Sequence, residues 1–282
     1  EKKRGLRLSK YAKMWLQVAF YSVGLTLIGM LIPGHEVGRG MLIRSLFPVA
    51  TGQYWYFCAY SGVFFMMPYL NALVRALDER EMCGLLLTVF GLFSCYATLA
   101  ARYKDMFVLD QGYSFAWLTL LYLVGACMKR KGAAEKMSVG KLLAVFAGCV
   151  LVMWGVGVLL LPVRDAAILI SYISPLVVMA AAALVICFAK LQIGPNMRGL
   201  VRSFAPAAFG VYLIHEHGVI FERLKAYCGK LAQISAVWTI PAILGSAAAV
   251  FVICLLAEKL RLILFEKLGV NDVVDRVFSK GG

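Results

Sequence analysis

Charged residues are scarce in this sequence. Asp, Glu, Lys and Arg make up 16% of its 282 residues, whereas hydrophobic residues make up 62% and the mean hydropathy is +0.81. An ordinary soluble domain is roughly 45–50% apolar. A soluble fold of this composition would have too little polar surface to cover its buried helices. The composition therefore predicts an all-α protein, a polytopic bundle of transmembrane helices.

Acidic residues are the scarcer charged type, with 15 Asp and Glu against 29 Lys and Arg and a net charge of +14. A basic excess can indicate nucleic-acid binding. Here, however, Lys and Arg concentrate in alternate loops between apolar runs, which is the pattern of the positive-inside rule. We therefore expect the lipid bilayer, and no nucleic acid, as the partner of these charges. The same rule predicts that both termini of a multi-pass protein are cytoplasmic.

The motifs of common soluble enzymes are also missing. The sequence contains no G-x-S-x-G, no Walker loop and no G-x-G-x-x-G. None of its 8 cysteines forms a C-x-x-C pair, and most lie in apolar runs, where a free cysteine behaves as a small hydrophobic residue. The cysteines therefore indicate neither a disulfide framework nor a zinc site.

The apolar runs are long enough for eight membrane spans, each of about 20 residues. An even number of spans agrees with two cytoplasmic termini. After Glu258 the tail is amphipathic, with Leu260, Ile263, Leu264 and Leu268 between charges, and it predicts a short interfacial helix. The predicted spans are 14–32, 50–74, 83–102, 114–129, 142–162, 167–189, 204–221 and 236–257.

The seventh predicted span contains the unusual triplet H-E-H. Glu216 is the one acidic residue that lies well inside a predicted span, where a central charge costs about 2.5–3.5 kcal/mol. On a helix, Tyr212, His215 and Glu216 share one face, and His217 points about 100° further round. These residues could satisfy one another structurally, or they could position a polar substrate or move a proton. Two histidines at i and i+2 face apart, so we expect no metal.

A second feature is the aromatic segment Q-Y-W-Y-F-C-A-Y. An aromatic belt at the membrane interface explains Tyr54 and Tyr56. Trp55 and Tyr60 lead into a span that also holds the polar Asn71, so they are candidates for the lining of a cavity.

A third feature is D-Q-G-Y-S-F-A-W, at the start of the fourth predicted span. Asp110 and Gly112 indicate a loop, and Ser114 is the predicted N-cap of the helix that follows. Ser114 and Trp117 join the candidate cavity residues.

A fourth feature is R-G-L-R, in which Arg4 and Arg7 are one helical turn apart. These arginines could be a plain positive-inside anchor. Alternatively, their guanidinium groups could clamp phosphates, which suits the geometry of arginine.

Several segments together resemble the membrane acyltransferase family 3, the O-acetyltransferases of bacterial surface polysaccharides. They occur in that family's order over almost the whole chain. The segments are S-K-Y-A-K-M-W-L-Q-V-A-F-Y-S-V, Q-Y-W-Y-F-C-A-Y with P-Y-L-N, G-Y-S-F-A-W-L-T-L-L-Y-L-V-G-A-C-M-K-R, and F-G-V-Y-L-I-H-E-H.

The resemblance implies a location in the bacterial plasma (inner) membrane, a reaction and a set of roles. An acyl group, acetyl or another short one, would pass from cytoplasmic acetyl-CoA (acyl-CoA) to a hydroxyl of a surface polysaccharide or lipid-linked glycan. Arg4 and Arg7 could match the family's R-x-x-R loop on the CoA side. Tyr212, His215 and Glu216 would line the acyl-transfer cavity.

The resemblance also implies a complete fold of ten helices, of which this chain would hold eight. The chain begins with Glu1, where we would expect the loop before the family's third helix. We therefore expect residues 1–282 to be a single acyltransferase domain that is incomplete at its N-terminus. The family's catalytic His would lie upstream of residue 1, so the chain alone would be inactive.

Two other functions also fit eight spans, and the first of them also fits one buried acidic residue. A transporter or glycan flippase would carry helices broken by Gly or Pro at matching positions in two halves, and we find no matching halves. A membrane scaffold without a ligand would leave Glu216 unexplained.

Overall fold

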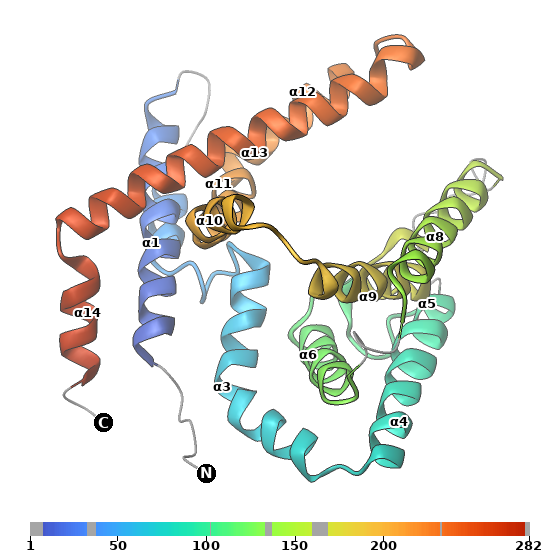
Figure 1. The fold of residues 1–282 in the computed structure, drawn as a ribbon. Helices are drawn as coiled ribbons and strands as arrows, with labels where there is room; N and C mark the ends of the chain where they lie inside the picture. The colour runs from blue at the N-terminus through green and yellow to red at the C-terminus, as the bar shows by residue number, and fades with distance from the viewer. Residues whose placement is uncertain are drawn as a thin grey trace. The chain divides into compact units, whose positions relative to one another are not determined.

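The computed structural model describes residues 8–32, 38–101, 103–132, 137–159, 169–231 and 233–279. Within these ranges every regular element is a helix and there is no strand (Figure 1), which confirms the predicted all-α class. The described residues form two compact units: unit 1 is 55–192, and unit 2 combines 8–54 with 193–279.

Four helical stretches in the described part of the chain are long and apolar enough to cross a membrane. They show that the protein is a multi-pass membrane protein. The other predicted spans correspond to helices that are shorter or more polar, such as the 16-residue Pro175–Lys190, so eight spans remain a prediction. The four stretches are Trp55–Ala76, Glu79–Ala100, Val139–Leu159 and Val237–Lys267.

Unit 1 is built from helices that pack in pairs. The most extensive contacts join α8 to α9 and α3 to α6. Arg130, in the last turn of α6, reinforces the second pair, because its guanidinium donates to the carbonyl oxygens of Val74, in the last turn of α3, and Leu77, just after that helix. The elements are α3 (Trp55–Ala76), α4 (Glu79–Thr88), η1 (Val89–Tyr96), α5 (Ala97–Ala100), η2 (Asp110–Gly112), α6 (Phe115–Arg130), α8 (Val139–Leu159) and α9 (Pro175–Lys190).

The helix from Glu79 to Ala100 contains a π-helical segment. It begins with a capping box, in which Asp78 and Glu81 each accept a hydrogen bond from the other's backbone N–H. Its middle, η1, has π-helical hydrogen bonds. Within and just after η1, the hydroxyls of Ser94 and Thr98 donate to the carbonyl oxygen of Ile173, at 2.6 and 3.4 Å. These bonds tie the π segment to the residues just before α9.

Unit 2 combines the first helices of the chain with the last ones. Within this unit α1 contacts α2, α11 and α14, and α11 contacts α13. The elements are α1 (Leu8–Met30), α2 (Arg39–Leu46), α10 (Pro195–Phe204), η4 (Ala205–Ala207), α11 (Ala208–His215), α12 (Gly218–Leu231), α13 (Ala236–Lys267) and α14 (Val270–Ser279).

The last predicted span is longer than expected. α13 has 32 residues and continues to Lys267 as one long helix (Figure 1), ten residues beyond the predicted end at 257. The predicted interfacial helix after Glu258 is therefore wrong in its position, because residues 258–267 belong to α13. A separate amphipathic helix, α14, follows and packs beside α1, where Lys13 Nζ lies 2.7 Å from Asp275 Oδ2.

The predicted span 204–221 is not one helix. α11 ends at His215, Glu216 is its C-cap, and α12 begins at Gly218. The break falls within the H-E-H triplet, so its three side chains take separate environments.

Candidate functional site

Tyr212, His215 and Glu216 form a small polar cluster at the C-terminal end of α11. The rings of Tyr212 and His215 meet edge to face with centroids 6.2 Å apart. His215 Nε2 lies 3.9 Å from Glu216 Oε2, and the two side chains are 38% and 30% exposed. The structure thus brings together the three residues that the sequence placed on one face, at a position that a ligand can reach.

The imidazole of His215 has a defined tautomer. Its Nδ1 lies 2.7 Å from the carbonyl oxygen of Val211, one turn earlier in α11. A carbonyl only accepts hydrogen bonds, so Nδ1 carries a proton, and the neutral form of the ring presents its lone pair at Nε2. Nε2 and the Glu216 carboxylate are then two neighbouring acceptors, and a hydroxyl that donates its proton is the kind of group that they attract.

His217, in contrast, is fully buried. Its Nδ1 accepts the backbone N–H of Val219 at 3.3 Å, so it caps the start of α12. Its Nε2 must then carry the proton, and it lies 3.3 Å from both the carbonyl oxygen of Ser22 and the hydroxyl of Thr26 in α1. His217 therefore fastens the break between α11 and α12 to α1, which is a structural role.

The ring of Tyr54 packs against Tyr212 of the polar cluster and against His217. The sequence interpretation as an interfacial belt residue is wrong, because the side chain is fully buried, with ring centroids 6.1 Å from Tyr212 and 6.4 Å from His217. Among the described residues its hydroxyl has no hydrogen-bond partner. A buried phenol in this state is an available donor beside the cluster.

Glu258 was missed by the sequence interpretation, which credited Glu216 as the one acidic residue within a span. Glu258 is fully buried in α13. Its carboxylate accepts hydrogen bonds from Tyr21 at 2.7 Å and Gln17 at 3.1 Å, both on α1. Arg261, one turn further along α13, donates from Nη2 at 2.5 Å and from Nε to both oxygens.

These donors saturate the Glu258 carboxylate, which can accept about four hydrogen bonds. A carboxylate with every lone pair occupied holds helices together and does not act as a proton acceptor. Gly210 in α11 allows the close approach, since a Cβ there would lie 2.6 Å from Glu258 Cδ. The signal in the sequence was the i, i+3 pair Glu258 and Arg261 within an apolar run, together with Gln17 and Tyr21 at i and i+4.

The remaining candidates lie in unit 1, where Asn71 and Ser114 have structural partners. Tyr122 donates to Asn71 Oδ1 at 3.1 Å and so links α3 to α6. Ser114 Oγ accepts the backbone N–H of Trp117 at 3.2 Å, which confirms Ser114 as the N-cap of α6. Tyr60 packs between the rings of Tyr56 and Phe64 along α3.

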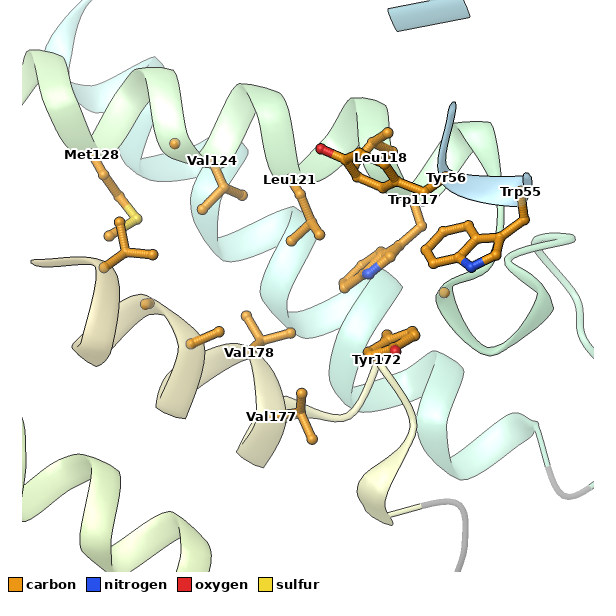
Figure 2. A pocket seen from close by; sticks show the side chains of 15 residues that line it. Trp55, Tyr56, Trp117, Leu118, Leu121, Val124, Met128, Tyr172, Val177 and Val178 are labelled. Atoms are coloured by element: carbon orange, nitrogen blue, oxygen red, sulfur yellow. The ribbon is translucent and has the colours of Figure 1, made fainter. Parts of the chain in front are cut away.

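Trp55 and Trp117 line a pocket of about 460 Å³ in unit 1. Figure 2 shows aromatic side chains at one end, where Trp55, Trp117 and Tyr172 approach one another, and aliphatic side chains from α6 and α9 along the rest. Gly112 shapes the aromatic end: its φ is +105°, and an added Cβ would lie 3.3 Å from the Cα of Tyr172. Glycine adopts this conformation without strain.

Arg4 and Arg7 lie outside the described residues. Across the described ranges, no group of three or more His, Cys, Asp or Glu side chains is arranged to hold a metal ion.

Comparison with known proteins identifies the family. The family model described as an acyltransferase domain, acyltransferase family 3, matches residues 2–259, which include the polar cluster, Glu258 and the aromatic pocket. No curated protein and no solved structure shows significant similarity to the chain. The chain belongs to acyltransferase family 3, and with its apolar helices it is a membrane acyltransferase.

Proposed function

We propose that the protein is an integral membrane O-acyltransferase that moves an acetyl or other short acyl group from acyl-CoA to a glycan hydroxyl. The acceptor would be a cell-surface polysaccharide or a lipid-linked glycan. Membership of the family supports the reaction class. The observation that carries the assignment to a site is the tautomer of His215, which presents Nε2 as an acceptor beside Glu216.

The reaction joins a sugar oxygen to the acyl carbon. The hydroxyl oxygen attacks the thioester carbonyl, the carbon–sulfur bond breaks, and the hydroxyl proton ends on the departing CoA thiol. His215 Nε2 would accept a hydrogen bond from the acceptor hydroxyl and so orient it for attack. Glu216 would favour the positive charge that His215 gains if it takes the proton. The Tyr54 phenol, whose ring packs against that of Tyr212, would be a further hydrogen-bond donor beside this cluster.

The family resemblance implies that the main general base is a different residue, the family's catalytic His. In that case His215 and Glu216 position the acceptor. Arg4 and Arg7 would then bind the phosphates of the CoA donor on the cytoplasmic side.

The test measures transfer of radiolabel from acetyl-CoA to glycan in membranes that contain the full-length protein and its native glycan. We expect His215→Ala and Glu216→Gln to lower the rate about 10²-fold or more, because each removes a group that orients or deprotonates the hydroxyl. The matched control is Glu222→Gln, an exposed carboxylate on α12, which should transfer label at the unmodified rate. If His215→Ala transferred label at the same rate as the control, His215 would not be part of the site.

The same assay separates this function from a transporter or flippase. A transporter would move glycan across the membrane without adding label to it, whichever acyl-CoA is supplied. Glycan translocation with no acyl transfer from any donor would therefore overturn the proposed function.

A further inference from the structure

We infer that the aromatic-ended pocket of unit 1 binds a glycolipid, with the hydrocarbon chain along α6 and α9 and the sugar against the aromatic rings. The inference deepens the proposed function and rests on it for the statement that this glycolipid is the acyl acceptor. The binding itself is argued from the residues of the pocket.

The long part of the pocket is suited to a hydrocarbon chain. Leu121, Val124 and Met128 of α6 face Val178 of α9 across it (Figure 2). With a volume of about 460 Å³ it falls within the size range of small-molecule sites. Val185, at the α9 side, is 65% exposed, so a chain can enter sideways from the bilayer.

The aromatic end is suited to a sugar ring. Trp55 lies nearly parallel to Tyr172, with an interplanar angle of 24° and centroids 6.1 Å apart. Tyr113 closes the group, with its ring centroid 4.7 Å from that of Trp55 and 5.0 Å from that of Tyr172. The negative faces of such rings attract the polarised C–H groups of a sugar. A phospholipid chain has no ring to place there.

The indole N–H of Trp117 is a hydrogen-bond donor that a purely apolar ligand would leave unpaired. Its side chain is only 1% exposed and lines the pocket between the aromatic and aliphatic ends. In the described part of the chain, its indole Nε1–H has no hydrogen-bond acceptor. A buried donor left unpaired costs about 1–3 kcal/mol. A glycosidic or hydroxyl oxygen at the junction of sugar and chain would satisfy it.

The test uses photo-crosslinking in the absence of acyl-CoA. The full-length protein is placed in nanodiscs of dioleoylphosphatidylcholine with a dodecyl glucoside that carries a diazirine in its alkyl chain. We expect the labelled peptides to come from α6 and α9, and excess unlabelled dodecyl glucoside to abolish the labelling. Dodecanol, which has the chain and one hydroxyl but no sugar ring, should compete at least about tenfold less well, since the contacts between the sugar and the aromatic rings are lost.

Two variants test the pocket directly. Trp117→Phe keeps an aromatic ring but removes the N–H donor together with part of the ring area, and should weaken competition by the glucoside about five- to tenfold. Ala181→Trp places a large ring in the pocket and should abolish labelling, whereas Ala189→Trp, an exposed position of the same helix outside the pocket, should leave it unchanged.

Three outcomes would overturn the inference: equal competition by dodecanol and the glucoside, labelling confined to other helices, or equal labelling of the Ala181→Trp and Ala189→Trp variants. Because no acyl donor is present, the failure of binding is separate from the failure of transfer. Specific labelling in a protein that transfers no acyl group would contradict the proposed function alone.

Discussion

At the scale of single residues, the two histidines of the H-E-H triplet have opposite roles. His215 is partly exposed and holds one backbone carbonyl of its own helix, whereas His217 is fully buried between α1 and α12. Sequence periodicity alone could place both on a helix, but it could not show that the helix ends between them. The buried side chain of His217 therefore has a structural role, and the partly exposed side chain of His215 is available to a ligand.

The close approach of Gly210 to Glu258 leads to a stability prediction. Gly210→Ala places a methyl group against a carboxylate that Tyr21, Gln17 and Arg261 hold in position, so Glu258 cannot move away. We expect the substitution to lower the free energy of unfolding by about 1–3 kcal/mol. Thermal unfolding of the purified protein in detergent measures the change.

The matched control is Gly245→Ala in α13, where an added Cβ meets nothing within 4 Å. This substitution should leave stability unchanged or raise it slightly, because alanine favours the helix by about 0.5–1 kcal/mol. Equal melting temperatures for the two variants would show that Glu258 is not held as described.

The sequence predicts the N-cap role of Ser114 but not the buried environment of Glu258, for a physical reason. An N-cap is a local device: Ser114 and the three residues after it contain all of its information. Glu258 instead gains its environment from Gln17 and Tyr21, more than 230 residues away in the chain. Hydropathy also falls where Glu258, Lys259 and Arg261 cluster, which led the predicted span to end too early.

At the scale of helices, the break between α11 and α12 depends on a side-chain cap. His217→Ala removes the acceptor for the Val219 N–H together with the contacts to α1, and should cost about 1–3 kcal/mol of unfolding free energy. His217→Asn keeps an oxygen able to cap α12 and should recover part of this loss. Denaturation in detergent, followed by circular dichroism, measures both.

His215→Ala is the contrasting control for this prediction. Its side chain is 38% exposed, so its removal should change stability by no more than about 0.5 kcal/mol. The pair thus separates the roles: His217 variants should lose stability, and His215 variants should lose acyl transfer. The opposite assignment of losses would contradict the roles given to both residues.

Helix boundaries were the least predictable feature at this scale. The apolar run 204–221 gave no sign of a break, because Gly218 and the two histidines that precede it are compatible with a continuous span. The break becomes favourable when Ser22 and Thr26 of α1 offer polar partners to His217. Local sequence does not contain those partners.

At the scale of the whole molecule, the alternating basic loops predict which side of the membrane each loop faces. Cys83 follows the predicted cytoplasmic loop with Arg75 and Arg80, and Cys228 lies in the predicted outer loop 222–235; both thiols are exposed. Variants that retain only one of them can report the orientation. In spheroplasts, a membrane-impermeant maleimide should label Cys228 but not Cys83.

Permeabilised membranes provide the control for this experiment, since both thiols should then react. A variant that retains only the buried Cys254 should stay unlabelled under either condition. Labelling of Cys83 from outside would reverse the predicted orientation, and with it the expected side of the acyl-CoA site.

Because of the π-helical segment η1, the contacts of this helix depend on its exact number of residues. Each π turn holds one residue more than an α turn. Deleting one residue ahead of Ser94 would let the helix return to α-helical hydrogen bonds, yet it would swing Ser94 and Thr98 about 100° away from the Ile173 carbonyl. A change that is favourable for the helix would thus be costly for its neighbour. During evolution, a single-codon loss here would be tolerated only together with a new partner for Ile173.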